Sequence, residues 1–181
     1  MDRSTATVPS ARGWVPSLVV LIGFLALAFA VAAGGSLATI ANVEGWYAEA
    51  EKAPWSPPNW LFAPVWTLLY TMMSVAAWLV WRARDDARET VARAVRPALA
   101  IYFGQLALNA VWTPIFFGLY PAIGTAALWI ALAVIVALAA AVPLTMVAFW
   151  KVSRTAALLL LPYWLWVLFA TTLNWAVAAL N

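Results

Sequence analysis

Residues 121–150 read PAIGTAALWIALAVIVALAAAVPLTMVAFW and contain no charged side chain. About 20 such residues are enough for a helix to cross a lipid bilayer. Four other stretches have the same apolar character: residues 15–40, 61–81, 97–118 and 156–180. The sequence therefore predicts an all-α membrane protein, built as a bundle of five transmembrane helices. Gly118 and Pro121 predict a tight turn between the third and fourth helices, because glycine ends helices and proline starts them.

The composition is typical of a membrane protein with a single domain. Apolar residues make up 66% of the 181 residues and charged residues 9%, whereas soluble domains carry about 25% charged residues. The length suits one domain, residues 14–181, and the polar residues 1–13 are expected to form a disordered extension. The chain has no Cys and no His, which excludes disulfides, thiolate metal sites and histidine-based catalysis or haem ligation. No metal site is expected, and nothing in the sequence supports nucleic-acid binding.

The charged residues divide between the two ends of the predicted bundle. Nine of the ten basic residues lie in the N-terminal extension, the second loop or the fourth loop, and Lys52 alone lies in the first loop. The positive-inside rule then predicts a cytoplasmic N-terminus. This bias favours the cytoplasmic membrane, with an outer membrane as the alternative. Residues 15–40 form too long an apolar core for a signal peptide.

The predicted spans contain few polar groups. None of them holds an Asp, Glu, Lys or Arg, which argues against a proton-driven carrier. Gln105 and Asn109 are four residues apart and Trp112 follows three later, so they share one face of the third helix. Such groups suit either hydrogen bonding between helices or contact with a ligand, and the spacing leaves both roles open.

Two further stripes combine aromatic residues on one helix face. Trp66 and Tyr70 are four apart in the second helix, and Tyr163, Trp166 and Ala170 follow one face of the fifth. Both tryptophans lie several residues inside their spans, whereas a tryptophan at a span end is ordinarily an anchor at the lipid headgroups. Proline also interrupts helices and opens space between them. Pro162 lies inside the fifth span, Pro143 inside the fourth and Pro114 near the end of the third.

The first loop, residues 45–60, reads GWYAEAEKAPWSPPNW. Its prolines and three tryptophans distinguish it from a flexible linker, which would be rich in Gly and Ser. We expect this loop to fold onto the bundle as a lid.

Four motifs of the chain follow one another in a familiar order: Trp46-Tyr47 with Lys52 and residues 55–58 (WSPP), residues 65–70 (VWTLLY), residues 105–109 (QLALN) with residues 112–118 (WTPIFFG), and Pro162-Tyr163 with Trp166 and Leu173-Asn174. With these motifs the chain resembles the TspO or translocator proteins, also called tryptophan-rich sensory proteins or peripheral benzodiazepine receptors. The resemblance covers residues 16–181. It implies a five-helix bundle whose ligand cavity is covered by the first loop.

The resemblance also implies ligands and site residues. The ligands are porphyrins, chiefly protoporphyrin IX, and isoquinoline carboxamide or benzodiazepine compounds; no cofactor is required. Trp66 and Trp166 match the pocket tryptophans implicated in light-dependent porphyrin breakdown, and are the candidate catalytic residues. The ligand-binding candidates are Tyr47, Trp66, Tyr70, Gln105, Asn109, Trp112, Tyr163, Trp166 and Ala170.

A homodimer interface on the third helix is implied too, where Ala100 and Gly104 have the small-xxx-small spacing that lets helices approach closely. Cholesterol binding in the form of the mitochondrial relatives is not expected, because no basic residue follows Tyr163. Three functions remain open: a porphyrin receptor serving tetrapyrrole transport or stress-linked regulation, a light-dependent porphyrin-degrading enzyme, and a non-catalytic membrane scaffold.

Overall fold

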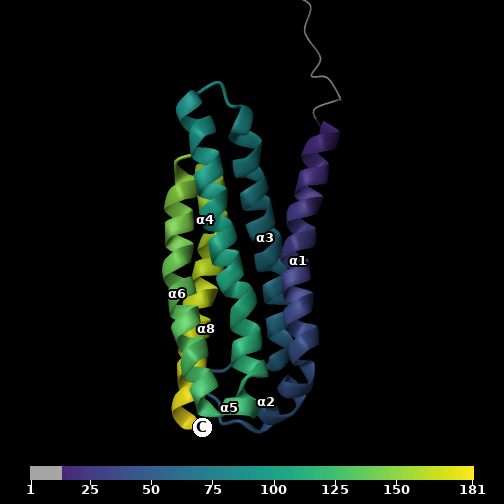
Figure 1. Ribbon diagram of the computed structural model, residues 1–181, viewed down its shortest axis with the longest axis vertical. Helices are drawn as coiled ribbons and strands as arrows, with labels where there is room; N and C mark the ends of the chain where they lie inside the picture. Colours follow the sequence, from purple (N-terminus) through teal and green to yellow (C-terminus); the bar gives the residue numbers. More distant parts are fainter. Residues whose placement is uncertain (1–13) are drawn as a thin grey trace, which may run out of the picture.

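The computed structural model describes residues 14–181, and this part of the chain is helical with no strand. Five helices are long and apolar enough to cross a membrane, and they lie side by side along the long axis of the molecule (Figure 1). The predicted five-helix membrane bundle is therefore confirmed. The expected disorder of residues 1–13 lies outside the described residues. The long helices are α1 (Trp14–Glu44), α3 (Phe62–Arg82), α4 (Glu89–Thr113), α6 (Thr125–Trp150) and α8 (Leu161–Leu180), and the short ones are α2 (Trp46–Glu49), α5 (Tyr120–Ile123) and α7 (Arg154–Leu159).

Helix α4 begins at Glu89, well before the expected start at Pro97. Hydropathy locates only the apolar part of a helix, and here the helix continues through polar residues that include Arg93 and Arg96. The connection before it is ordered by Asp86, which accepts hydrogen bonds from the backbone N–H of Arg88 (2.8 Å) and from its guanidinium (3.0 Å). These bonds lower the pKa of Asp86 to about 2.

The expected tight turn at Gly118 and Pro121 is wrong in detail. Residues Pro114–Gly118 form a π-helical turn, and Pro121 then lies in the first turn of the short helix α5. The sharp change of direction comes at Gly124, whose φ of 60° favours glycine, directly before α6. Pro114 has no N–H to donate to the preceding turn, and a shift of hydrogen-bond register at this point is the local consequence.

The other two expected kinks differ from each other. Pro162 lies in the first turn of α8, and the fifth span is divided there into α7 and α8. Ser153 accepts a hydrogen bond from the N–H of Ala156 (3.3 Å) and so caps α7. Pro143, in contrast, lies inside the uninterrupted helix α6, as prolines of membrane helices often do when neighbouring helices compensate.

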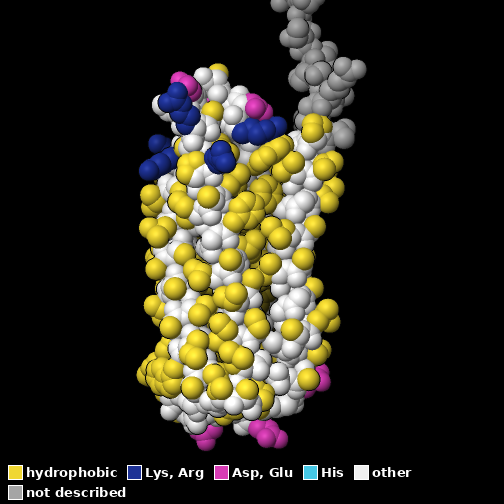
Figure 2. Space-filling model, viewed as in Figure 1, with side chains coloured by type: hydrophobic (Ala, Val, Ile, Leu, Met, Phe, Trp, Pro, Cys, Tyr) yellow, Lys and Arg dark blue, Asp and Glu magenta, His cyan; other side chains and the backbone are white. Residues whose placement is uncertain are grey.

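The outer surface between the two ends of the bundle is apolar, as a lipid-facing surface must be (Figure 2). Basic side chains gather at one end, which we call the basic end: residues 82–96 between α3 and α4, and residues 151–154 between α6 and α7. The other end, which we call the loop end, carries residues 45–60 and the acidic Glu44, Glu49 and Glu51. The charge separation expected from five spans is present.

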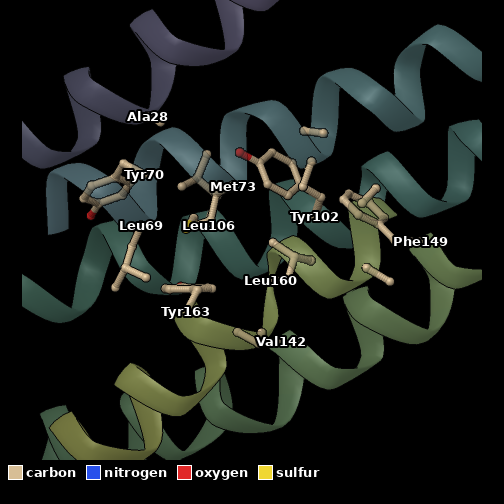
Figure 3. Packing of buried hydrophobic residues seen from close by; sticks show 14 of the residues in the cluster. Ala28, Leu69, Tyr70, Met73, Tyr102, Leu106, Val142, Phe149, Leu160 and Tyr163 are labelled. Atoms are coloured by element: carbon tan, nitrogen blue, oxygen red, sulfur yellow. The ribbon is translucent and has the colours of Figure 1, made fainter. Parts of the chain in front are cut away.

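The largest cluster of buried residues lies mostly in the half of the bundle nearer the basic end, and two smaller clusters lie nearer the loop end. Met73, Tyr102, Phe149, Leu160 and Tyr163 are among its largest buried side chains, and they come from α3, α4, α6, the α7–α8 junction and α8 (Figure 3). Tyr102 and Phe149 stack with ring centroids 6.0 Å apart. Small residues, including Ala28, Ala76 and Ala77, let the helices approach closely here. Packing is therefore dense in this half, and the cavity lies in the other.

Candidate functional site

A cavity of about 500 Å³ lies in the loop-end half of the bundle. Typical small-molecule sites have volumes of about 300–1,000 Å³, so this one suits a drug-sized or larger flat ligand. Helices α1, α3 and α8, the end of α4 and the π-helical turn form its wall, and Tyr47 of the first loop contributes as well. The wall consists of Phe29, Val31, Ala32, Ala33, Ser36, Thr39, Val43, Tyr47, Asn59, Phe62, Ala63, Trp66, Thr67, Tyr70, Trp112, Thr113, Phe116, Phe117, Trp166, Ala170, Leu173 and Asn174.

Three tryptophans from three helices lie in this wall: Trp66 on α3, Trp112 on α4 and Trp166 on α8. Each is held by another aromatic ring. The ring centroids are 5.4 Å apart for Trp66 and Tyr70, 5.3 Å for Trp112 and Phe116, and 5.8 Å for Phe62 and Trp166. The wall therefore offers flat, electron-rich surfaces from several sides, which suits an aromatic ligand.

Six of the nine expected ligand-binding residues line the cavity: Tyr47, Trp66, Tyr70, Trp112, Trp166 and Ala170. Gln105, Asn109 and Tyr163 do not. They are buried and joined by hydrogen bonds behind Tyr70. The Tyr70 hydroxyl donates to Oδ1 of Asn109 (2.6 Å), Nδ2 of Asn109 donates to the Tyr163 hydroxyl (3.1 Å), and that hydroxyl donates to Oε1 of Gln105 (3.0 Å).

This buried polar network joins three helices, α3, α4 and α8, at the boundary between the core and the cavity. Of the two roles that the spacing left open, its geometry matches hydrogen bonding between helices. Through the Tyr70 hydroxyl it also fixes the orientation of one wall side chain. A ligand contact by Gln105, Asn109 or Tyr163 stays a prediction.

A second polar connection holds Trp112 in place. Its indole N–H donates to Oδ1 of Asn174 (3.0 Å), and Nδ2 of Asn174 donates to the carbonyl of Leu128 (3.0 Å). The indole N–H of Trp166, in contrast, has no hydrogen-bond partner among the described residues, although it is buried. A buried donor without an acceptor is unfavourable. The Trp166 side chain would therefore be stabilised if its indole N–H could rotate to reach an acceptor on a ligand or a water molecule.

Neither hydropathy nor residue spacing marks the wall residues of α1 or the phenylalanines Phe62, Phe116 and Phe117. Helix α1 is apolar on every side, so no periodic pattern marks the face that it turns to the cavity. Asn174, which belongs to the Leu173-Asn174 motif but is not among the expected site residues, is also in the wall.

The first loop packs against the loop end and is held at several points. The indole N–H of Trp46 donates to the carbonyl of Phe117 (3.0 Å), and its ring stacks on Tyr120 at 3.9 Å. The indole N–H of Trp55 donates to the hydroxyl of Thr172 (3.3 Å). Tyr47 is partly enclosed by this packing, and the loss of water around it raises the pKa of its hydroxyl.

Asn181 fastens the same loop to the end of α8. Its side chain accepts a hydrogen bond from the N–H of Glu51 (3.0 Å), and its Nδ2 donates to the carbonyls of Glu51 (3.0 Å) and Val177 (2.9 Å). The Asn181 side chain thus joins the first loop to α8, two segments that are far apart in the sequence.

We expect Asn181→Ala to speed amide hydrogen exchange at Glu51 by about five-fold, the effect of losing one hydrogen bond of roughly 1 kcal/mol. The measurement is hydrogen–deuterium exchange on peptides that cover the first loop. Asn181→Asp is the matched control: it keeps the acceptor for the Glu51 N–H and should give an intermediate rate. Exchange at the wild-type rate in Asn181→Ala would show that the loop is held by its tryptophans alone.

Ala100 and Gly104 of α4 are exposed on the outer surface and do not line the cavity. A Cβ atom added to Gly104 would meet no atom within 4 Å. Because both side chains are small, a second helix can approach the lipid-facing side of α4 closely at this point without any change inside the bundle.

A scaffold whose tryptophans only anchor it would lack a cavity beside Trp66 and Trp166. Both residues line one here. Other tryptophans do point outward: Trp129 and Trp175 are 47% and 51% exposed, on α6 and α8 respectively. Some tryptophans therefore line the cavity, and others face outward from the bundle.

Comparison with known proteins agrees with this architecture. Residues 24–180 match the TspO/MBR family. The tryptophan-rich protein TspO of Archaeoglobus fulgidus is 39% identical over 91% of this chain and 99% of its own length. The human translocator protein is 42% identical over 73% of this chain and 72% of its own, and the tryptophan-rich sensory protein of Cereibacter sphaeroides is 35% identical over 87% and 90%. The chain thus belongs to the TspO/MBR family and is a multi-pass membrane protein of that family.

Proposed function

We propose that the protein is a membrane receptor that binds a porphyrin, with protoporphyrin IX as the reference ligand, in the cavity at its loop end. The carrying observation is the placement of Trp66, Trp112 and Trp166 around one cavity of about 500 Å³. A porphyrin is flat, aromatic and mostly apolar, so its ring stacks on indoles and fits between helices.

The first loop offers a basic side chain for the polar edge of such a ligand. Protoporphyrin IX carries two carboxylates, and Lys52 is the one basic residue of the first loop. Its ammonium lies 4.8 Å from the centre of the Tyr47 ring, beside a residue of the wall. We therefore orient the carboxylates toward the first loop and the apolar edge toward Tyr70.

Titration of the purified protein with protoporphyrin IX tests this proposal. Tryptophan fluorescence should fall saturably, because indoles in the wall come within a few ångströms of the ring. An isoquinoline carboxamide should compete, since it would occupy the same aromatic wall. Linear quenching without saturation, equal to that of free tryptophan, would reject the proposal.

We keep light-dependent porphyrin degradation as a second candidate, because Trp66 and Trp166 both lie in the wall. One electron would pass from an indole to the excited porphyrin, so the indole is oxidised and the porphyrin reduced. Dissolved dioxygen would then add both of its oxygen atoms across a carbon–carbon bond of the ring and open it, and the electron would return to the indole. This chemistry needs no general acid or base. If Trp66→Phe and Trp166→Phe bleach bound porphyrin under light at the parental rate, this candidate fails while binding still stands.

We place the protein in a cytoplasmic membrane with its basic end toward the cytoplasm, on the positive-inside rule. Relatives carry the names translocator protein and tryptophan-rich sensory protein, which supports a role in transport or sensing; we propose tetrapyrrole transport or stress-linked regulation as that role. A cysteine introduced at exposed Glu49 should react with a membrane-impermeant reagent in whole cells, and one at exposed Arg88 should not.

We also propose a homodimer through the face that carries Ala100 and Gly104. Gly104→Val should convert dimer to monomer without unfolding, because a Cβ atom at this exposed position meets no atom of the described residues within 4 Å. Chemical crosslinking in native membranes measures this. Ala137→Val, on the exposed side of α6, is the matched control and should leave the dimer intact. Equal crosslinking of both variants would show that the dimer interface does not involve the face with Ala100 and Gly104.

A further inference from the structure

A second cleft, of about 240 Å³, lies at the basic end and plays no part in the proposed porphyrin site. The first turns of α1 supply Pro16 and Ser17 to it. The end of α3 and the short 3-10 turn that follows supply Trp81, Arg82, Arg84 and Asp85. Two guanidinium groups therefore face one carboxylate, and the cleft has an excess of positive charge.

The two arginines differ in their partners. Arg84 pairs with Asp85 at 3.2 Å. Arg82 has no carboxylate partner within the part of the chain that the structure describes. At the same end of the bundle, residues 82–96 and 151–154 together contain seven basic and three acidic residues. An anion entering the cleft is thus attracted by the near arginines and by the wider field.

Indole rings hold both guanidinium groups. The guanidinium carbon of Arg84 lies 3.5 Å from the centre of the Trp81 ring, and that of Arg82 lies 4.8 Å from the centre of the Trp78 ring. Trp78 in turn donates its indole N–H to the carbonyl of Ser17 (2.8 Å). The opposite sides of the cleft are therefore tied together, and the planar guanidinium groups are already ordered for phosphate oxygens.

The surroundings of the cleft suit a lipid better than a free anion. Tryptophans such as Trp78 and Trp81 mark the depth of the headgroups. Below the cleft the outer side of α1 is apolar, with Leu18 and Ile22 52% and 57% exposed. Figure 2 shows basic side chains gathered at this end of the molecule, above the apolar surface of the bundle. A phosphate held in the cleft would therefore leave two acyl chains lying along α1 and α3.

We propose that this cleft binds the headgroup of an anionic phospholipid, with Arg82 and Arg84 contacting its phosphate. The excess of positive charge favours a headgroup without its own ammonium group, such as phosphatidylglycerol, over phosphatidylcholine. The bound lipid would brace the α1–α3 pair at the end opposite to the porphyrin cavity.

Native mass spectrometry of the full chain in detergent tests this inference. Dioleoyl phosphatidylglycerol should form more adducts than dioleoyl phosphatidylcholine. The double variant Arg82→Gln with Arg84→Gln should lose most of this preference, because each arginine is expected to raise it by about five-fold. The single variants should each lose about five-fold, so the test stands even if the double variant does not fold. Protoporphyrin IX affinity, measured alongside, should not change in these variants.

The matched control is Arg88→Gln with Arg93→Gln, which removes the same charge from two arginines that pair with Asp86 and Glu89 outside the cleft. This control should keep its preference for phosphatidylglycerol. Equal losses in control and cleft variants would mean a diffuse charge effect and would overturn the proposal. Displacement of the lipid by millimolar inorganic phosphate, or equal adducts of both lipids, would overturn it as well.

Discussion

Trp166→Ala is expected to weaken protoporphyrin IX binding by about 10-fold or more, because stacking on an aromatic side chain is worth about 1–3 kcal/mol. Trp166 lies in the cavity wall, and its ring is held between Phe62 (5.8 Å) and Phe169 (5.5 Å). The loss of the indole removes a stacking surface that no neighbour replaces. Absorbance of the bound porphyrin gives the affinity without relying on tryptophan fluorescence.

Trp129→Ala is the matched control for this experiment. It removes the same side chain from an outward-facing position on α6 that does not line the cavity, and should leave the affinity unchanged. Equal losses in the two variants would mean that the porphyrin binds to the lipid-facing surface. An unchanged affinity in Trp166→Ala would show that Trp166 does not contribute to porphyrin binding.

Asn109→Ala is expected to destabilise the protein by about 1 to 3 kcal/mol, because the Tyr70 hydroxyl loses its acceptor and the Tyr163 hydroxyl loses the group that donates to it. Asn109 accepts from the Tyr70 hydroxyl and donates to that of Tyr163, so it is the middle of the network between α3, α4 and α8. The free energy of unfolding in mixed micelles titrated with dodecyl sulfate measures the effect. Porphyrin affinity, measured well below the transition, should change less than the stability does, because Asn109 does not line the cavity.

Thr145→Val is a suitable control, since the buried Thr145 hydroxyl bonds only to the carbonyl of Ala141 on its own helix (2.9 Å). Its loss should have little effect on stability. A variant Asn109→Ala that keeps its stability but loses the ligand would favour the other role that the spacing allowed, direct contact with the porphyrin. The pair of measurements therefore separates the two roles.

Much of this fold could be predicted from hydropathy, because a charge-free run of some 20 residues has few alternatives to a membrane helix. The ends of the elements could not. Helix α4 extends through Arg93 and Arg96 into a region that hydropathy does not mark. The π-helical turn at Pro114–Gly118 depends on how the chain absorbs one missing N–H, and α-helix periodicity cannot reveal it.

The site shows the same division. Trp66 and Trp166 could be singled out because each lies inside a span and shares a stripe with a tyrosine. The contribution of α1 could not be predicted, because a helix that is apolar all around shows no preferred face. Nor could spacing tell that Gln105 and Asn109 turn toward Tyr163 rather than into the cavity, since this depends on the rotation of α4 against α8.

The division of the bundle into a dense half and a hollow half has an evolutionary consequence. Side chains such as Tyr102 and Phe149 supply close packing away from the cavity, whereas Trp66, Phe62 and Ser36 border it. Substitutions around the cavity leave most of the packing undisturbed, so natural variation can change ligand preference there while the bundle keeps folding. Diversity of ligands among proteins of this architecture is then the expected outcome of one stable half carrying a variable one.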